Sequence, residues 1–150
     1  MVTPRLLLDR ILAALRGVRP RRYRGSRGAG QRWEDLAARR LAAAGYAIRE
    51  RNFRGRTGEI DLIGEEDGFL CFVEVKGRSG AGFGRPAEAV TADKQRRVAR
   101  AAQEYLRRRR LPPSTRCRFD VVAIEDGGGK PEVTILRDAF PMPEPRGPRS

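Results

Sequence analysis

Two stretches predict the centre of the fold, Gly58-Glu59-Ile60-Asp61-Leu62-Ile63 and Phe72-Val73-Glu74-Val75-Lys76. Each has the apolar or alternating pattern that is typical of a β-strand. Asp67-Gly68, which lies between them, is the strongest short-range sequence signal for a two-residue hairpin turn. The sequence therefore predicts a β-hairpin that turns at Asp67-Gly68.

A turn at these two residues fixes the register of the hairpin. It pairs Ile63 with Phe72 and therefore places Asp61 directly opposite Glu74. Residues that face each other in an antiparallel pair share one face of the sheet, with Cβ atoms about 4.5–5.5 Å apart. Lys76 points to the same face as Glu74, because side chains alternate along a strand. We thus expect two carboxylates and one ammonium group on one face of the hairpin.

Two facing carboxylates repel each other unless a cation lies between them. Oxygen ligands without a nearby histidine or cysteine favour Mg²⁺ or Mn²⁺, and Mg²⁺ is usually held by one or two carboxylates together with phosphate and water. A metal and a lysine beside a phosphate describe a site for phosphodiester hydrolysis. The alternative is that Asp61 and Glu74 are solvent-facing positions paired with arginines, and the hairpin alone does not separate these interpretations.

The charge of the chain is consistent with a nucleic-acid partner. The 150 residues fit one domain, and 32 Lys and Arg against 19 Asp and Glu give a net charge of +13. Residues 1–27 hold eight arginines and one aspartate, so much of the excess lies in an arm before the domain. Such an arm fits nucleic-acid phosphates, but charge alone does not separate DNA, RNA, an anionic membrane and a solvated extension.

The absence of histidine excludes more kinds of site than any motif suggests. Ser-His-Asp hydrolysis, HExxH zinc proteolysis and His-dependent nuclease mechanisms are all excluded. Cys71 and Cys117 are too far apart for a CxxC motif, so we expect a reduced, cytoplasmic setting with Cys71 as a core residue. No apolar run reaches the roughly 18 residues of a transmembrane segment.

The sequence divides into three parts. Residues 1–27 are predicted to be a basic extension, with an amphipathic helix over 3–16 and a Gly- and Arg-rich linker. This helix is expected to cap the domain or to act as a mobile arm, with docking on a membrane or protein as an alternative. Residues 28–140 form the domain, and residues 141–150, with four prolines, are predicted to be a disordered tail.

Within the domain, the patterns predict an α/β or α+β sandwich around one sheet. Gly45 ends the first helix, Thr91 or Asp93 caps the second, and the glycines that follow Lys76 predict a substrate-side loop. The Asp120 carboxylate is interpreted as structural, because nothing pairs it with the first site. The expected elements are a helix over 31–44, strands over 46–53, 58–63 and 72–76, a loop over 77–84, a helix ending before 112, and strands over 119–124 and 132–136.

Several strings in this order closely resemble the bacterial YraN-like endonuclease-related family. The resemblance extends from about Gly28 to Phe140 and implies membership of the PD-(D/E)XK nuclease superfamily. It implies a restriction-endonuclease-like or tRNA-endonuclease-like core with a mixed sheet of about five strands flanked by helices. The strings that carry it are Glu34-Asp35-Leu36-Ala37, Arg51-Asn52-Phe53-Arg54, Gly58-Glu59-Ile60-Asp61-Leu62-Ile63, Phe72-Val73-Glu74-Val75-Lys76-Gly77-Arg78, Lys94 and Arg118-Phe119-Asp120-Val121-Val122.

The resemblance also implies a role for each matching residue. Asp61 and Glu74 would be metal ligands together with the Val75 carbonyl, and Lys76 would be the lysine of the ExK element. Glu34 matches the glutamate of the first helix, which commonly reaches the metal through water in this superfamily. Asp61, Glu74, Lys76 and Glu34 are therefore the expected catalytic residues, with Mg²⁺ or Mn²⁺ as cofactor.

One residue departs from the family pattern. Trp33 stands where the family usually has a glycine ahead of the glutamate, and we interpret its indole as an anchor of the helix in the core. The residues expected to contact nucleic acid are Arg54, Arg78, Lys94 and Arg97.

The expected function is a metal-dependent endonuclease that hydrolyses phosphodiester bonds, in structured or branched DNA rather than RNA. Two alternatives remain at this point: a non-catalytic nucleic-acid-binding module that keeps the fold, and a basic adaptor that docks through its first helix. No base-reading motif is visible, so recognition of DNA shape is expected. A homodimer is expected by analogy with archaeal Holliday junction resolvases, which cut two strands.

Overall fold

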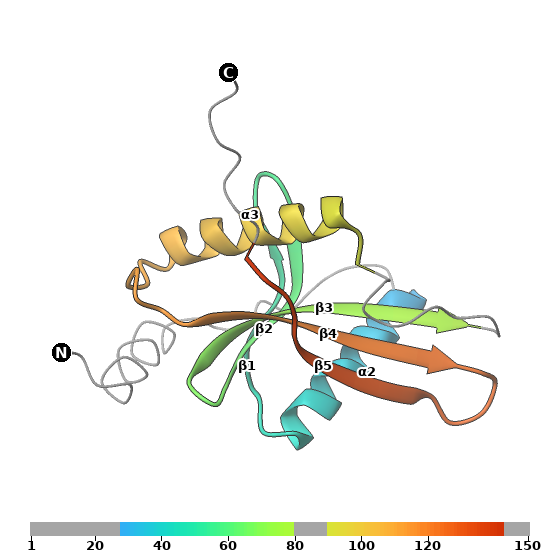
Figure 1. Cartoon of the computed structure of the whole chain (residues 1–150). Helices are drawn as coiled ribbons and strands as arrows, with labels where there is room; N and C mark the ends of the chain where they lie inside the picture. The colour runs from blue at the N-terminus through green and yellow to red at the C-terminus, as the bar shows by residue number, and fades with distance from the viewer. Residues whose placement is uncertain (1–27, 80–89, 143–150) are drawn as a thin grey trace.

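The computed structural model describes residues 28–79 and 90–142 (Figure 1). The predicted extension over 1–27, the tail beyond residue 142 and most of the glycine-rich loop lie outside the described residues. Within residues 28–79 and 90–142, two helices and five strands follow one another. They are α2 (Ala29–Ala43), β1 (Ala47–Arg54), β2 (Glu59–Glu66), β3 (Phe69–Ser79), α3 (Ala92–Arg108), β4 (Cys117–Asp126) and β5 (Glu132–Phe140).

The five strands form one mixed sheet in the order β1-β2-β3-β4-β5. Only β3 and β4 are parallel, because α3 carries the chain across the sheet between them; the other neighbours are antiparallel. Figure 1 shows α3 on one face of the sheet and α2 on the other. The predicted α/β class, with about five strands flanked by helices, is confirmed.

Each helix buries an apolar stripe against its own face of the sheet. Val98, Ala102 and Tyr105 of α3 pack in one core cluster with apolar side chains of all five strands. Ala37 and Leu41 of α2 pack in a second cluster on the opposite face. No helix in the described part of the chain is long and apolar enough to cross a membrane.

The central hairpin has the predicted register. Asp67 and Gly68 both have positive φ, 51° and 78°, which is the conformation of a type I′ turn. Ile63 pairs with Phe72, and the ladder continues to the pair Leu62 and Val73. Asp61 and Glu74 are the next residues on the two strands.

The boundaries of β3 correct one prediction. The loop predicted from Gly77 is wrong for its first three residues, because Gly77 pairs with Ile124 and the strand continues to Ser79. Pairing with the long parallel strand β4 supplies backbone partners that the glycines alone do not suggest. The predicted helix signals are confirmed: Gly45 has φ 101° after α2, and the Thr91 side chain accepts a hydrogen bond from the Lys94 N–H.

Candidate metal-binding and active site

Asp61 and Glu74 meet where the pairing of β2 and β3 ends. Beyond the pair Leu62 and Val73, the Val75 N–H donates to Asp61 Oδ2 at 2.8 Å. The Asp61 carboxylate therefore replaces a strand carbonyl as the partner of this amide. This hydrogen bond fixes Asp61 on the flank of β3, beside Glu74.

The pair is short of positive charge. Glu74 is only 5% exposed, and its ion-pair partner among the described residues is Lys94, with Nζ 3.2 Å from Oε1. Burial, and then the charge of Glu74, raise the pKa of Asp61 above its usual range, while the Val75 amide and Lys94 act against that rise. One lysine thus serves two adjacent carboxylates, as expected for a site that accepts a further cation.

Glu34 extends from α2 toward the same place. Asn52 Nδ2 donates to Glu34 Oε2 at 3.1 Å, and burial raises the pKa of Glu34, with the Asp61 charge adding to the rise. Asn52 has φ 54° within β1, a left-handed conformation that Asn tolerates better than most residues. Asn52 is not among the site residues predicted from the sequence, although an Asn inside a predicted strand is itself unusual.

Trp33 fixes the start of α2 against β3. A Cβ atom on Gly77 would lie 1.7 Å from the Trp33 ring, so the indole occupies the space that any side chain at position 77 would need. Trp33 also packs against the core cluster on the α2 face, which confirms its predicted anchoring role. The contact holds the neighbouring Glu34 close to the strand that carries Glu74.

Val75 and Lys76 complete the predicted ligand and catalytic set. The N–H and C=O of one strand residue point to the same side, so the Val75 carbonyl faces the Asp61 side of β3. Lys76 is half-buried, lies two residues beyond Glu74 on the same face, and forms no salt bridge with any described residue.

The predicted nucleic-acid contacts fall into two groups. Arg54, Lys94 and Arg97 line one cleft of about 420 Å³ between the turn after β1 and α3. Within it Lys94 also contacts Glu74, which places it in the acidic site itself. The backbone at Arg78 belongs to β3 and pairs with Glu125, and its side chain lies outside the described atoms.

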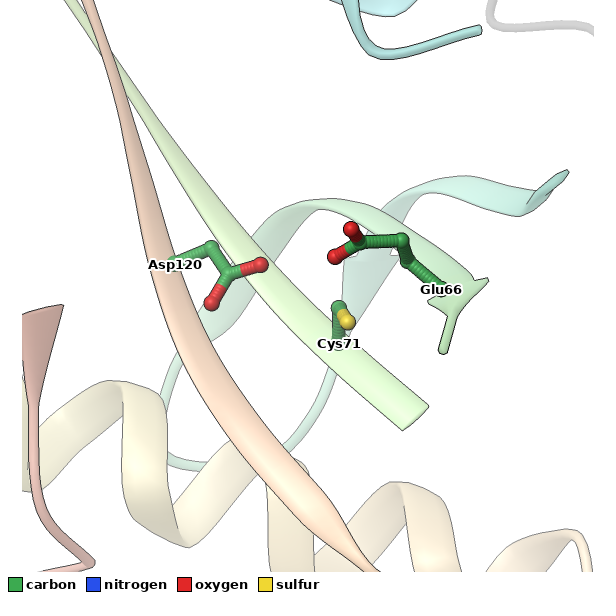
Figure 2. A group of neighbouring side chains, drawn as sticks. All are labelled: Glu66, Cys71 and Asp120. Atoms are coloured by element: carbon green, nitrogen blue, oxygen red, sulfur yellow. The ribbon is translucent and has the colours of Figure 1, made fainter. Parts of the chain in front are cut away.

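A second acidic cluster lies on the α2 face of the sheet. Glu66, Cys71 and Asp120 bring their ligand atoms within 4.8 Å of one another, and Figure 2 shows the two carboxylates and the thiol facing a common space. Burial raises the pKa of the Cys71 thiol to about 12, which keeps it protonated. A protonated thiol is a poor metal ligand.

The carboxylates of this cluster already have their partners. Asp120 accepts from Arg118 Nε at 2.8 Å, from the Tyr46 hydroxyl at 2.7 Å and from the Asp138 N–H at 2.9 Å. Glu66 pairs with Arg118 and with Arg137. The cluster is an internal ion-pair network, in agreement with the structural role predicted for Asp120.

A known protein family and several curated relatives match most of this chain. Residues 33–124 match the family described as Uncharacterised protein family UPF0102. A UPF0102 protein of Rhodococcus opacus is 54% identical over 112 residues, which cover 74% of this chain and 94% of that protein. One from Symbiobacterium thermophilum is 51% identical over 116 residues, 77% of this chain and 98% of that protein. This chain belongs to the UPF0102 family.

Proposed function

We propose that this chain is a metal-dependent endonuclease that hydrolyses phosphodiester bonds, with structured or branched DNA as its substrate. In this proposal it is a YraN-like member of the PD-(D/E)XK nuclease superfamily. The observation that carries the proposal is the pair Asp61 and Glu74: the two carboxylates share one lysine, and burial, followed by the Glu74 charge, raises the pKa of Asp61. Such a pair costs folding free energy unless a cation binds it.

The available donors fit a hard divalent cation. Asp61, Glu74 and the Val75 carbonyl offer only oxygen atoms, which is the ligand type that Mg²⁺ and Mn²⁺ prefer. Burial, and then the charge of Glu74, raise the pKa of Asp61, and a cation bound beside both carboxylates would oppose that rise. When bound there, the metal would acidify water and neutralise charge on the scissile phosphate.

The side chains around the pair have separate tasks in this mechanism. Lys76 binds a phosphate oxygen, orients the substrate and stabilises the negative charge that develops in the transition state. Glu34, held by Asn52, orients the attacking water by accepting a hydrogen bond from it. With a metal held by Asp61 and Glu74, Lys94 would no longer be needed as the counter-ion of Glu74 and could contact a substrate phosphate.

The test is cleavage of a labelled panel of linear duplex, single strand, flap, four-way junction and structured RNA. Each substrate is incubated with Mg²⁺, Mn²⁺ or EDTA and wild type, Asp61→Asn, Glu74→Gln, Lys76→Ala or Asp67→Asn. Asp67 is the matched control, because it lies at the other end of the same hairpin, is exposed, and occupies a turn position that suits Asn.

We expect metal-dependent cleavage by wild type and Asp67→Asn, and a loss of at least 100-fold, on the order expected for electrostatic catalytic groups, in the other three variants. The preferred substrate would define the substrate class. Cleavage retained by Glu74→Gln would contradict the proposed site. Binding without cleavage in any metal would favour a non-catalytic nucleic-acid-binding module.

A further inference from the structure

The outward face of α3 and the turn after β1 together form a long depression beside the proposed active site. It consists of three adjoining clefts, and the two larger ones measure about 420 Å³ and 470 Å³. Thr57 lines both of these, while Arg97 and Arg100 connect them to the third. We call the surface lined by these clefts the α3 groove. Lys94, which contacts Glu74, lies at the end of the groove nearest the carboxylate pair.

The turn that forms one wall of the α3 groove is fixed to the helix. Glu104 of α3 accepts a hydrogen bond from the Arg56 N–H at 2.8 Å and pairs with Arg108 at 2.6 Å. A Cβ atom on Gly55 would lie 2.2 Å from the Glu104 carboxylate, and one on Gly58 would lie 2.8 Å from the Arg97 carbonyl oxygen. Glycine at both positions lets the turn lie directly on α3. Figure 1 shows the turn rising beside this helix.

Positive charge in the groove exceeds what its own acids neutralise. Arg96 pairs with Asp93, and Arg108 with Glu104. Four further exposed arginines of the groove form no salt bridge with any residue over 28–79 and 90–142. They are Arg56, Arg97, Arg100 and Arg107.

These charges form a line that leads away from the carboxylate pair. Lys94, Arg97, Arg100 and Arg107 are three or seven residues apart, so they follow one side of α3. From Arg97 to Arg107 the helix rises about 15 Å at 1.5 Å per residue. One strand of duplex DNA places a phosphate about every 3.4 Å along its axis, so this length matches about four phosphates.

The side chains of the groove favour a duplex backbone over the other polyanions. Among the residues over 28–79 and 90–142, none that lines the three clefts is aromatic, whereas single-strand sites combine basic charge with aromatic platforms for base stacking. An amphipathic helix on a membrane needs an exposed apolar face, but Val98, Ala102 and Tyr105 of α3 are buried against the sheet. Met142, outside this surface, is the one exposed large hydrophobic side chain among the described residues.

We infer that the α3 groove binds the phosphate backbone of duplex DNA over about four phosphates on one side of the scissile bond. This inference rests on the proposed nuclease function for the direction of the DNA, which runs from Asp61 and Glu74 along α3. If this inference holds, the substrate is a polynucleotide with a duplex arm on the α3 side of the scissile bond. Arg100 and Arg107 serve as positioning residues that hold this arm.

The experiment measures binding of the full chain to a fluorescein-labelled 20-base-pair duplex in EDTA by fluorescence anisotropy at several KCl concentrations. The double variant Arg100→Gln/Arg107→Gln is compared with Arg39→Gln/Arg40→Gln. The second pair removes the same charge from exposed positions on α2, on the opposite face of the sheet. EDTA separates binding from cleavage.

We expect the groove variant to bind the duplex about tenfold more weakly. The slope of log K against log of the KCl concentration should become shallower by about two, since each lost phosphate contact lowers it by about 0.9. The α2 variant should bind nearly as wild type does. If the two double variants weakened duplex binding equally, or if neither weakened it, the inference would be overturned, because the groove would then contribute nothing specific to binding.

Two further measurements identify the occupant. A single strand of the same length should depend less on Arg100 and Arg107 than the duplex does. Binding of phosphatidylglycerol vesicles that depends on these arginines, without such dependence for the duplex, would make the groove a membrane surface and contradict the inference.

Groove-dependent duplex binding without cleavage of any substrate would retain the inference and reject the nuclease. Cleavage that does not depend on Arg100 and Arg107 would retain the nuclease and reject the inference.

Discussion

The two faces of the sheet hold two pairs of carboxylates that differ in how their charge is balanced. On the α2 face, Asp120 and Glu66 share Arg118, and Arg137 adds a second guanidinium. On the α3 face, Asp61 and Glu74 share only Lys94 among the described residues, and Asp61 has a raised pKa. Asp61 and Glu74 lie on the neighbouring strands β2 and β3, whereas Glu66 and Asp120 lie on β2 and β4, with β3 between them.

The difference separates a structural pair from the pair that we propose to bind a metal. Asp120 is fully buried, and its two carboxylate oxygens accept hydrogen bonds from a tyrosine, an arginine and a backbone amide. A buried acid with that many partners stabilises the arrangement around it. Asp61 has one backbone donor and a facing carboxylate, so its charge is only partly compensated. Incomplete compensation in a folded domain is the feature that indicates a ligand.

The largest expected effect comes from removing the Arg118 guanidinium that Asp120 and Glu66 share. Arg118→Met leaves Asp120 buried without its counter-ion, and losing one partner of a buried pair costs about 3–5 kcal/mol of unfolding free energy. Urea unfolding followed by Trp33 fluorescence would measure this loss. Arg137→Met is the graded control, since Arg137 is 42% exposed and should cost less than about 1 kcal/mol.

Equal losses in the two variants would show that burial of Arg118 adds nothing. Adding Asp120→Asn to Arg118→Met should recover part of the loss, because it removes the unpaired charge.

The site could be predicted from the sequence as far as local register determines it. Asp67-Gly68 specifies one turn type, and that turn sets the register as far as the pair Leu62 and Val73, one residue before Asp61 and Glu74. Beyond that pair the Asp61 side chain accepts from the Val75 N–H, and no ladder pair of Asp61 with Glu74 forms. The helix signals at Gly45 and Thr91 are local in the same sense, and both were correctly predicted.

Contacts between distant segments could not be predicted in this way. The contact between Trp33 and Gly77 requires the packing of α2 on the sheet, and the position of Lys94 against Glu74 requires the crossover helix to be in place. Asn52 has one feature of each kind. Its left-handed backbone is a local feature, whereas its hydrogen bond to Glu34 is a tertiary contact.

Removal of Lys94, the ion-pair partner of Glu74, tests whether its ammonium group competes with a metal for this carboxylate. Lys94→Met should raise the affinity for Mn²⁺ about tenfold, since the metal no longer displaces an ammonium group from Glu74. Isothermal titration calorimetry without nucleic acid would measure the affinity. The same variant should lose stability in EDTA, because two carboxylates then face each other without a counter-ion.

Arg96→Met is the matched control on the same helix, since Arg96 pairs with Asp93 on the helix surface and should leave metal affinity unchanged. A lower Mn²⁺ affinity in Lys94→Met would show that Lys94 holds Glu74 in its ligand position and does not compete with the metal.

The smallest expected effect comes from Asp61→Asn, and its dependence on pH is the informative part. Burial and the Glu74 charge hold the folded pKa of Asp61 above the unfolded value of about 3.9, so the folded state binds more protons between these two values. Stability without metal therefore falls as pH rises through that window. Asn removes this titration and still offers an oxygen to the Val75 N–H.

We expect Asp61→Asn in EDTA to be more stable than wild type by about 1 kcal/mol at pH 8, with the difference disappearing near pH 4. Asp67→Asn, in the exposed turn, should show no such pH dependence. Asp120→Asn should have the opposite sign at pH 8, because it deprives Arg118 of its partner. If Asp61→Asn proved destabilising at every pH, the Asp61 charge would be stabilising, and the two carboxylate pairs would be equivalent.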